Sequence, residues 1–336
     1  MQYSADKWPI LGHDWAVDLL TTAFNGGRTR HAYLLTGPVS IGKTTFARAM
    51  AMAFNCTAEK DRPCGVCRAC TLIEKGGHPD ITLIEADRVG GTMKIDQIRE
   101  MQHILALRPY EARYRVAILR RFHEANAAAQ NALLKTLEEP PASVKLILTA
   151  NDASLLLPTI RSRCQPLPLK PLKIDMVKDA LEKFWDASAE QADLLAHLSG
   201  GRIGWAIRAV QDDSTLALRE ESIDLLEALI SSPRRVRFEQ AEALAKDKDK
   251  LYEVLHLWQA YWRDMFLLVN GNSAWMSNID RQSFMAELKT KFPPETFQRA
   301  LTATRRTMNY IARNVNTRLA VETMLLDYPF IKGRLM

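Results

Sequence analysis

The chain has 336 residues, of which 47% are hydrophobic and 25% charged, and its formal net charge is +6. This length and apolar content predict two or three compact domains with cores of their own, and they exclude a disordered or fibrous protein. The basic excess gives weak support for a polyanionic partner such as a nucleic acid. No apolar run is as long as a membrane span, and residues 1–10 lack the regions of a signal peptide, so we expect a cytoplasmic protein without a membrane partner.

The first predicted element is an amphipathic helix that ends before Gly26. Its apolar side chains recur at helical spacing, and they are Trp15, Leu19, Leu20 and Phe24. A short apolar run over residues 31–36 then predicts a buried strand.

A phosphate-binding loop is predicted directly after this strand. Residues 37–44 read GPVSIGKT, which fits G-x-x-x-x-G-K-S/T in its required position between a strand and a helix. The glycines let backbone N–H groups converge on phosphates, and Lys43 is expected to reach the β and γ oxygens. The alternative is an accidental glycine-rich turn. The nucleotide-binding residues predicted here are Gly37, Gly42, Lys43, Thr44 and Thr45.

Four of the five cysteines lie close together, at Cys56, Cys64, Cys67 and Cys70. The spacing C-x7-C-x2-C-x2-C is typical of a tetrahedral metal site, and a reducing cytosol favours metal ligation over disulfides. Four thiolates leave no open position for water, so we expect a structural zinc ion. Buried free thiols are the alternative. Cys164 is too distant in the chain to join this cluster by spacing, and its role stays open.

The residues that decide the function directly follow a predicted central strand over residues 116–119. P-loop ATPases normally place an Asp and a Glu where this strand ends, to hold Mg²⁺ and activate water. This chain has Arg120 and Arg121 there, so we expect no intrinsic ATPase activity. Arg120 could approach the nucleotide phosphates in place of the metal, or an ion pair of Arg120 could keep the site empty. His123 and Glu124 could be proposed as replacements for the missing carboxylates. They lie one helical turn further on, however, and should point away from the site.

Three further segments complete the predicted sheet domain and begin a helical region. Residues 144–149 predict another strand, which ends in Thr149-Ala150-Asn151. Residues 157–164 read LPTIRSRC, and prolines 166, 168 and 171 are typical of a linker. From residue 177 the pattern is helical, and Trp258, Trp262 and Phe266 recur at core-like helical spacing.

Several motifs together resemble the AAA+ clamp-loader subunits of bacterial DNA polymerase III. They are NALLKTLEEPP at residues 131–141, HPD at residues 78–80, I-x-x-I-R at residues 95–99, Ser-Arg-Cys at residues 162–164 and the cysteine spacing. The resemblance implies an α/β AAA+ P-loop domain with a parallel sheet and an inserted zinc module near residues 56–70, spanning residues 1–168. It further implies a small helical lid over residues 169–212 and an all-α collar for oligomerisation over residues 213–336.

The resemblance also assigns roles to individual residues. Arg163 of Ser-Arg-Cys corresponds to an arginine finger that acts in trans on a neighbouring subunit's nucleotide, and Thr149 lies where the family has a polar sensor of the γ-phosphate. Lys94 and Arg99 become candidate DNA contacts, with solvated surface charge as the alternative. Family ATPases usually keep an arginine near position 204, and Arg202 is close but displaced.

Within the family the pattern is most similar to the delta-prime branch. That branch has lost the catalytic carboxylates, and many of its members have also lost the phosphate-binding loop. This chain retains the loop, so ATP or ADP could still bind, without carboxylates for Mg²⁺. The branch further implies a ring with gamma/tau and delta subunits that serves the sliding clamp and primer-template DNA. The main alternative is an ATP-hydrolysing gamma/tau-like motor, which should carry Asp-Glu at positions 120 and 121. A zinc-containing nucleic-acid-binding protein that acts alone is the alternative from another class, and it has no use for Ser-Arg-Cys.

Overall fold

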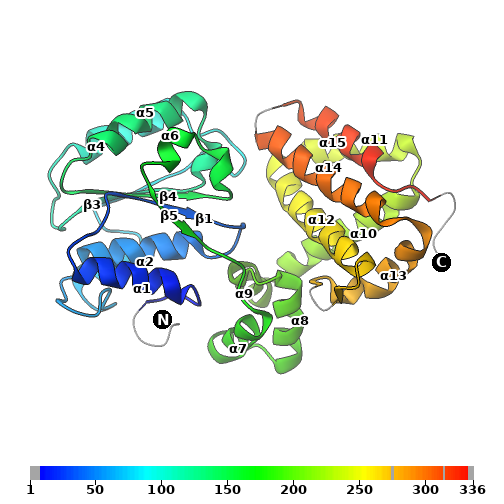
Figure 1. Cartoon of the computed structure of the whole chain (residues 1–336), viewed down its shortest axis with the longest axis horizontal. Helices are drawn as coiled ribbons and strands as arrows, with labels where there is room; N and C mark the ends of the chain where they lie inside the picture. The colour runs from blue at the N-terminus through cyan, green and yellow to red at the C-terminus, as the bar shows by residue number, and fades with distance from the viewer. Residues whose placement is uncertain (1–7, 274–275, 313–314, 332–336) are drawn as a thin grey trace. The chain divides into compact units, whose positions relative to one another are not determined.

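The computed structural model describes residues 8–273, 276–312 and 315–331 (Figure 1). The chain divides into two compact units, Met1–Ala180 with Gly201–Trp205, and Leu181–Gly200 with Ala206–Met336. The finer division into sheet domain, lid and collar stays a prediction. Among the described residues, no helix combines the length and the apolar character that crossing a bilayer requires.

The first unit is built on a five-stranded sheet with the order β2-β3-β4-β1-β5, in which all neighbours are parallel. Its strands are β1 (Ala32–Thr36), β2 (Ile81–Ile84), β3 (Arg115–Leu119), β4 (Val144–Ala150) and β5 (Gln165–Pro168). Parallel strands place their carboxyl ends at one edge, which is where ligands bind in open α/β sheets. The predicted α/β fold class with a parallel sheet is confirmed.

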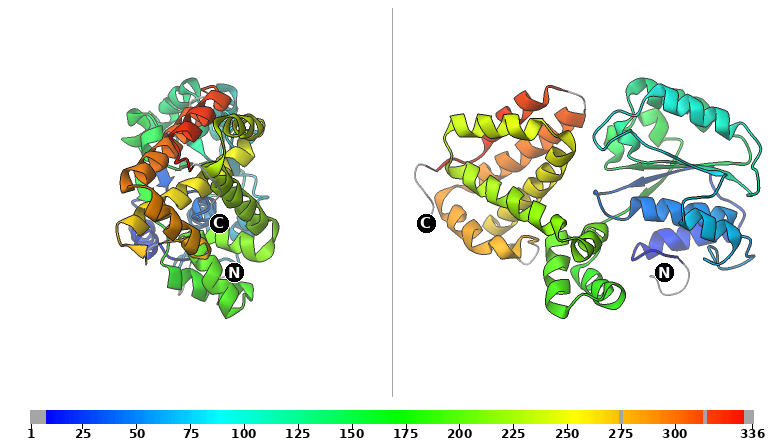
Figure 2. Two further views of the ribbon diagram at one scale, coloured as in Figure 1. Left: turned by 90° about the vertical axis from the view of Figure 1, so that its right-hand side faces the viewer. Right: turned by 180° about the vertical axis from the view of Figure 1, so that it is seen from behind.

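Helices cover both faces of this sheet (Figures 1 and 2). One face carries α1 (Asp14–Asn25) and α2 (Lys43–Asn55), and the other carries α4 (Ile95–Leu105) and α5 (Ala127–Glu138). Successive strand side chains point to opposite faces. Leu35 of β1 therefore packs in the core beneath α1 and α2, whereas Leu34 packs in the core beneath α4 and α5. Two short helices, α3 (Arg68–Glu74) and α6 (Pro158–Arg161), also belong to this unit.

The buried face of α1 differs from the prediction. Ala16 and Leu20 are buried, but Trp15 and Leu19 are 46% and 44% exposed. Residues 15 and 19 lie one position before residues 16 and 20, so they lie about 100° around the helix from the buried pair. The small Ala16 allows close packing on the core, a preference that counting large apolar residues does not reveal.

The second unit is helical. It contains α8 (Ala189–Ser199), α10 (Ser214–Ser231), α11 (Arg234–Ala245), α12 (Lys248–Val269), α13 (Gln282–Lys291), α14 (Pro294–Ala312) and α15 (Thr317–Asp327), while α7 (Ile174–Trp185) and α9 (Ile203–Gln211) are divided between the units. Trp258 and Trp262 are fully buried, as their spacing predicts. Trp262 lies 5.0 Å from the ring of Tyr328, centroid to centroid, in an edge arrangement.

Candidate functional site

The loop of residues 37–42 joins β1 to α2 at the carboxyl edge of the sheet. Gly37 and Gly42 have φ angles of 147° and 101°, which side chains of L residues disfavour. A Cβ on Gly37 would also lie 2.4 Å from the carbonyl oxygen of Leu169. These glycines are therefore needed for the loop's path, which is the path expected of a phosphate-binding loop. Thr44 and Thr45 lie in the first turn of α2, half-buried and exposed respectively.

Lys43 folds back over this loop. Its Nζ donates to the carbonyl oxygens of Gly37 at 2.6 Å and Pro38 at 2.7 Å, and to Oδ1 of Asn151 at 3.2 Å. Burial lowers the pKa of Lys43 to about 7. A phosphate that binds the loop would exchange these neutral acceptors for charged ones, which favour the ammonium form.

The end of β4 contributes Thr149 and Asn151 to the same edge. The hydroxyl of Thr149, the predicted sensor, is buried and accepts from the backbone N–H of Arg121 at 2.9 Å. Asn151, two residues further on, is the side chain that contacts Lys43. The sequence predicted a sensor in residues 149–151, at Thr149 rather than at Asn151. An amide directly after a strand that neighbours the loop's own strand is the signal that could have identified it.

The two arginines after β3 are held by carboxylates. Arg120 Nη1 lies 3.2 Å and Arg121 Nη1 lies 2.8 Å from Oε2 of Glu85. Arg121 Nε also lies 2.9 Å from Oε2 of Glu124, whose other oxygen accepts from the backbone N–H of Gly90 at 3.0 Å. Glu124 therefore contacts Arg121 and Gly90, and burial raises its pKa although Arg121 opposes the shift.

Glu85 follows β2, and in the sheet order β2 lies on the far side of β3 from the loop's strand β1. The ion pairs of Arg120 and Arg121 with Glu85 are therefore directed away from the phosphate-binding loop. In Arg120 the Nε is buried and has no hydrogen-bond partner within the described part of the chain. Glu85 was not among the residues predicted from the sequence to form the site. Its role as partner of two arginines depends on which strands are neighbours.

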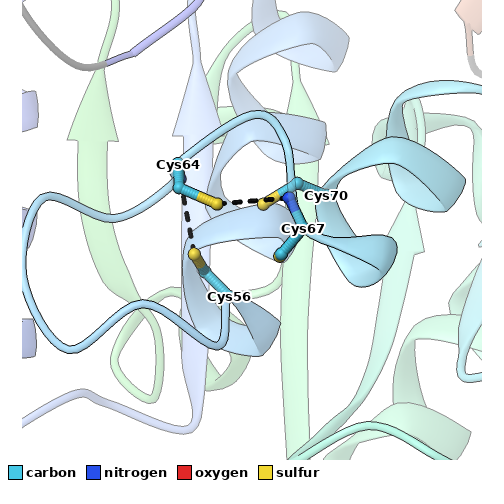
Figure 3. Close-up of side chains that lie close together, drawn as sticks. All are labelled: Cys56, Cys64, Cys67 and Cys70. Carbon is cyan, nitrogen blue, oxygen red and sulfur yellow. Dashed lines mark hydrogen bonds between the residues drawn. The ribbon is translucent and has the colours of Figure 1, made fainter.

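The four predicted metal ligands come together near the start of α3 (Figure 3). The Sγ atoms of Cys56, Cys64, Cys67 and Cys70 all lie within 4.8 Å of one another, so the cluster can hold a metal ion. Zn–S bonds of about 2.3 Å imply sulfur atoms about 3.8 Å apart in a tetrahedron, which this donor set fits. Backbone N–H groups of Cys64 and Cys67 donate to Sγ of Cys56 and Cys64, each at 3.3 Å.

These surroundings act differently on the individual thiols. Burial opposes ionisation of Cys67, but hydrogen bonds from the backbone of Thr57 and Cys70 outweigh it and lower its pKa to about 6. Burial raises the pKa of Cys70, which is the fully buried ligand. A bound divalent cation favours the thiolate form of every ligand.

Cys164 is separate from this cluster. It is buried in the core that underlies α4 and α5, whereas Cys56 and Cys70 belong to the core that underlies α1 and α2. Burial raises the pKa of Cys164 to about 12. Its thiol is therefore protonated at neutral pH and behaves as a small apolar side chain.

Arg163 follows α6 and is tied to its own unit by three contacts. Nη1 donates to the carbonyl oxygen of Thr159 at 2.9 Å and lies 3.4 Å from Oγ of Ser162. Nη2 lies 2.8 Å from Oε1 of Glu138, the last residue of α5, and the arginine side chain is 35% exposed. The guanidinium is therefore accessible at the surface of this unit.

The start of α9 contacts the phosphate-binding loop. The backbone N–H of Gly204 donates to the carbonyl oxygen of Ser40 at 2.9 Å, and a Cβ on Gly204 would lie 2.9 Å from that same oxygen. An arginine at this position would have no room without a shift of the backbone. The guanidinium of Arg202 lies 6.0 Å from the ring centroid of Trp205.

The candidate DNA contacts Lys94 and Arg99 lie at and near the start of α4. Both side chains are exposed, and Arg99 Nη1 lies 3.6 Å from Oδ1 of Asp96. Their contacts fit solvated surface charge as well as a nucleic-acid surface.

The amino-acid sequence of this chain is similar to those of known DNA polymerase III subunits. The model of the family "DNA polymerase III, delta subunit" matches residues 12–173. The delta' subunit of Bacillus subtilis DNA polymerase III is 32% identical, over 76% of this chain and 77% of its own length. The Pseudomonas aeruginosa delta' subunit is 37% identical over 52% of this chain and 55% of its own length.

The relatives named as tau subunits are matched over a smaller share of their own length. The tau subunit of Escherichia coli DNA polymerase III is 37% identical over 54% of this chain, and this chain spans only 29% of that relative. The delta' relative from Bacillus subtilis, by contrast, is matched over most of its length. On this similarity and the matching family model, the chain belongs to the AAA+ clamp-loader subunits of DNA polymerase III.

Proposed function

We propose that this chain is a clamp-loader subunit of the delta-prime type, which does not hydrolyse ATP itself. The observation that carries the proposal is the arginine pair at residues 120 and 121, held by Glu85 and Glu124 where an ATPase has the carboxylates of its magnesium site. The chain would help to load the sliding clamp on primed DNA and would supply Arg163 to a neighbouring ATPase subunit.

The absence of hydrolysis follows from electrostatics. Phosphoryl transfer is catalysed almost entirely by positioning and by charge stabilisation, and both depend on a metal ion and an oriented water. At the end of β3 the available carboxylates, Glu85 and Glu124, are already neutralised by guanidinium groups. Mg²⁺ would have to displace a guanidinium to reach either of them.

We expect purified chain to show no ATP turnover above that of its Lys43→Ala variant, because in both the carboxylates beside the end of β3, Glu85 and Glu124, are paired with guanidinium groups. The measurement is phosphate release with and without primed DNA. Turnover that disappears in Lys43→Ala would contradict the proposal and favour the gamma/tau-like alternative.

The loop retains the residues that bind phosphate, and we propose that nucleotide binds without Mg²⁺. In calorimetry, ATP should give the same affinity with EDTA as with Mg²⁺, and Lys43→Ala should abolish the heat. Strict dependence on Mg²⁺ would contradict this expectation, and heat in neither condition would remove nucleotide binding altogether.

The role of Arg120 in nucleotide binding is a separate question for the same calorimetry. Its guanidinium would have to leave Glu85 to contact a phosphate, and Nε is a donor without a hydrogen-bond partner among the residues that the structure describes. If Arg120 replaces the charge of the metal, Arg120→Ala weakens ATP binding. If the affinity is unchanged, the loop and Lys43 alone hold the nucleotide.

The partners of the chain are proposed from the same assignment. We infer a hetero-oligomeric ring with gamma/tau and delta subunits, which contacts the sliding clamp and primer-template DNA as an assembly. The four-cysteine cluster would hold a structural zinc ion, because no ligand position stays open for water.

A further inference from the structure

Glu138 and Arg163 form an ion pair that the phosphate-binding site does not use. Nη2 of Arg163 lies 2.8 Å from Oε1 of Glu138, which is the last residue of α5. Ser162 and Thr159 provide the remaining contacts of the guanidinium, both through Nη1. The proposed finger is thus fixed from two sides, by a carbonyl of the preceding helix α6 and by the carboxylate of Glu138 at the end of α5.

These contacts leave part of the guanidinium available. An arginine has five N–H donors in one plane, and a phosphate can be bound through two of them in parallel. The contacts within the described residues engage Nη1 and Nη2, and they leave Nε without one. The ion pair therefore restricts the orientation of the side chain without consuming all of its donors.

We propose that Glu138 is a positioning residue for Arg163, which holds the guanidinium in one orientation before a neighbouring subunit's nucleotide docks against it. This inference rests on the proposed role of Arg163 in trans. A flexible arginine must lose its side-chain freedom when it binds a phosphate, and a carboxylate partner removes part of that freedom beforehand. Glu138 needs no contact with the nucleotide for this effect.

The exposure of the pair argues against permanent retention of Arg163 by Glu138. The side chain of Glu138 is 50% exposed and that of Arg163 is 35% exposed, so water and salt weaken their attraction. A nucleoside triphosphate carries more negative charge than one carboxylate, and it competes for the same guanidinium. The ion pair therefore orients Arg163 but does not prevent it from binding a phosphate.

The test uses the complex reconstituted with its ATPase subunits, with Glu138→Gln in this chain. Glutamine keeps the size and an acceptor oxygen but removes the charge. Exposed ion pairs change equilibria up to about fivefold, so at the one site that receives Arg163 we expect kcat to fall up to about fivefold while KM for ATP is unchanged. The total ATP turnover of the complex then also falls, but by less than in the Arg163→Ala variant. Glu139→Gln is the matched control, because it removes the same charge from the next, exposed residue.

A double-variant cycle separates positioning from a general structural effect. If Glu138 acts through Arg163, Glu138→Gln has no effect in the Arg163→Ala background. Wild-type turnover in Glu138→Gln, increased turnover, or a loss that persists without Arg163 would each overturn the inference while the role of Arg163 stands. If Arg163→Ala itself turns over ATP like the wild type, the proposed function fails first, and the inference fails with it.

Discussion

Replacing Arg163 with alanine is expected to lower the DNA- and clamp-stimulated ATP turnover of the assembled complex, and with it the rate of clamp loading. An arginine finger typically contributes roughly 10³ to 10⁵ in rate at the site that it serves. Only one site in the ring would receive this finger, so the total turnover falls partially. If this chain does not hydrolyse ATP, as proposed, the phosphate that Arg163 serves would be that of a neighbouring subunit.

Folding should survive this substitution because the contacts of Arg163 lie at the surface. Its ion pair with Glu138 is partly exposed on both sides, and such pairs contribute at most about 1 kcal/mol. Arg161→Ala is the matched control, since Arg161 is an exposed arginine at the end of α6, two residues before Arg163. A complex with Arg163→Ala that assembles and loads clamps at the normal rate would show that Arg163 has only a structural role.

The parts of the site that local spacing encodes could be predicted from the sequence. The loop around Lys43 needs its glycines at fixed positions, and the backbone angles of Gly37 and Gly42 explain why. The four cysteines lie at the spacing of one tetrahedral ion, and their sulfur atoms come together. In both cases the residues that act together are close in the chain, so their pattern alone indicates their geometry.

The parts that depend on strand order could not be predicted in this way. Glu85 meets Arg120 and Arg121 because β2 is the neighbour of β3, and Asn151 meets Lys43 because β4 is the neighbour of β1. Neither adjacency is written in a local pattern. The Arg120 alternatives remained open for the same reason, since the direction of its guanidinium depends on a carboxylate 35 residues earlier in the chain.

Removal of the proposed zinc ion should affect stability more than any other change considered for the first unit. Metal analysis is expected to return about one zinc per chain, and Cys67→Ser is expected to lose it. Zinc binding contributes on the order of 10 kcal/mol to the folding of isolated zinc peptides, where the metal replaces a core. The first unit has its own core, so we expect a smaller loss of about 3 kcal/mol, at the upper end of the usual range for a single substitution.

The loss should spread beyond the cysteine loop because two of the ligands are part of the core. Cys56 and Cys70 pack with the side chains of α2, so an unligated site exposes part of that core to rearrangement. A loss of about 3 kcal/mol corresponds to a melting temperature lower by roughly 6 to 12 °C for a unit of this size. Val66→Ala is the control, since Val66 lies between Cys64 and Cys67 and is 84% exposed. Metal-free protein that melts at the wild-type temperature would refute a structural zinc site and favour the alternative of buried free thiols.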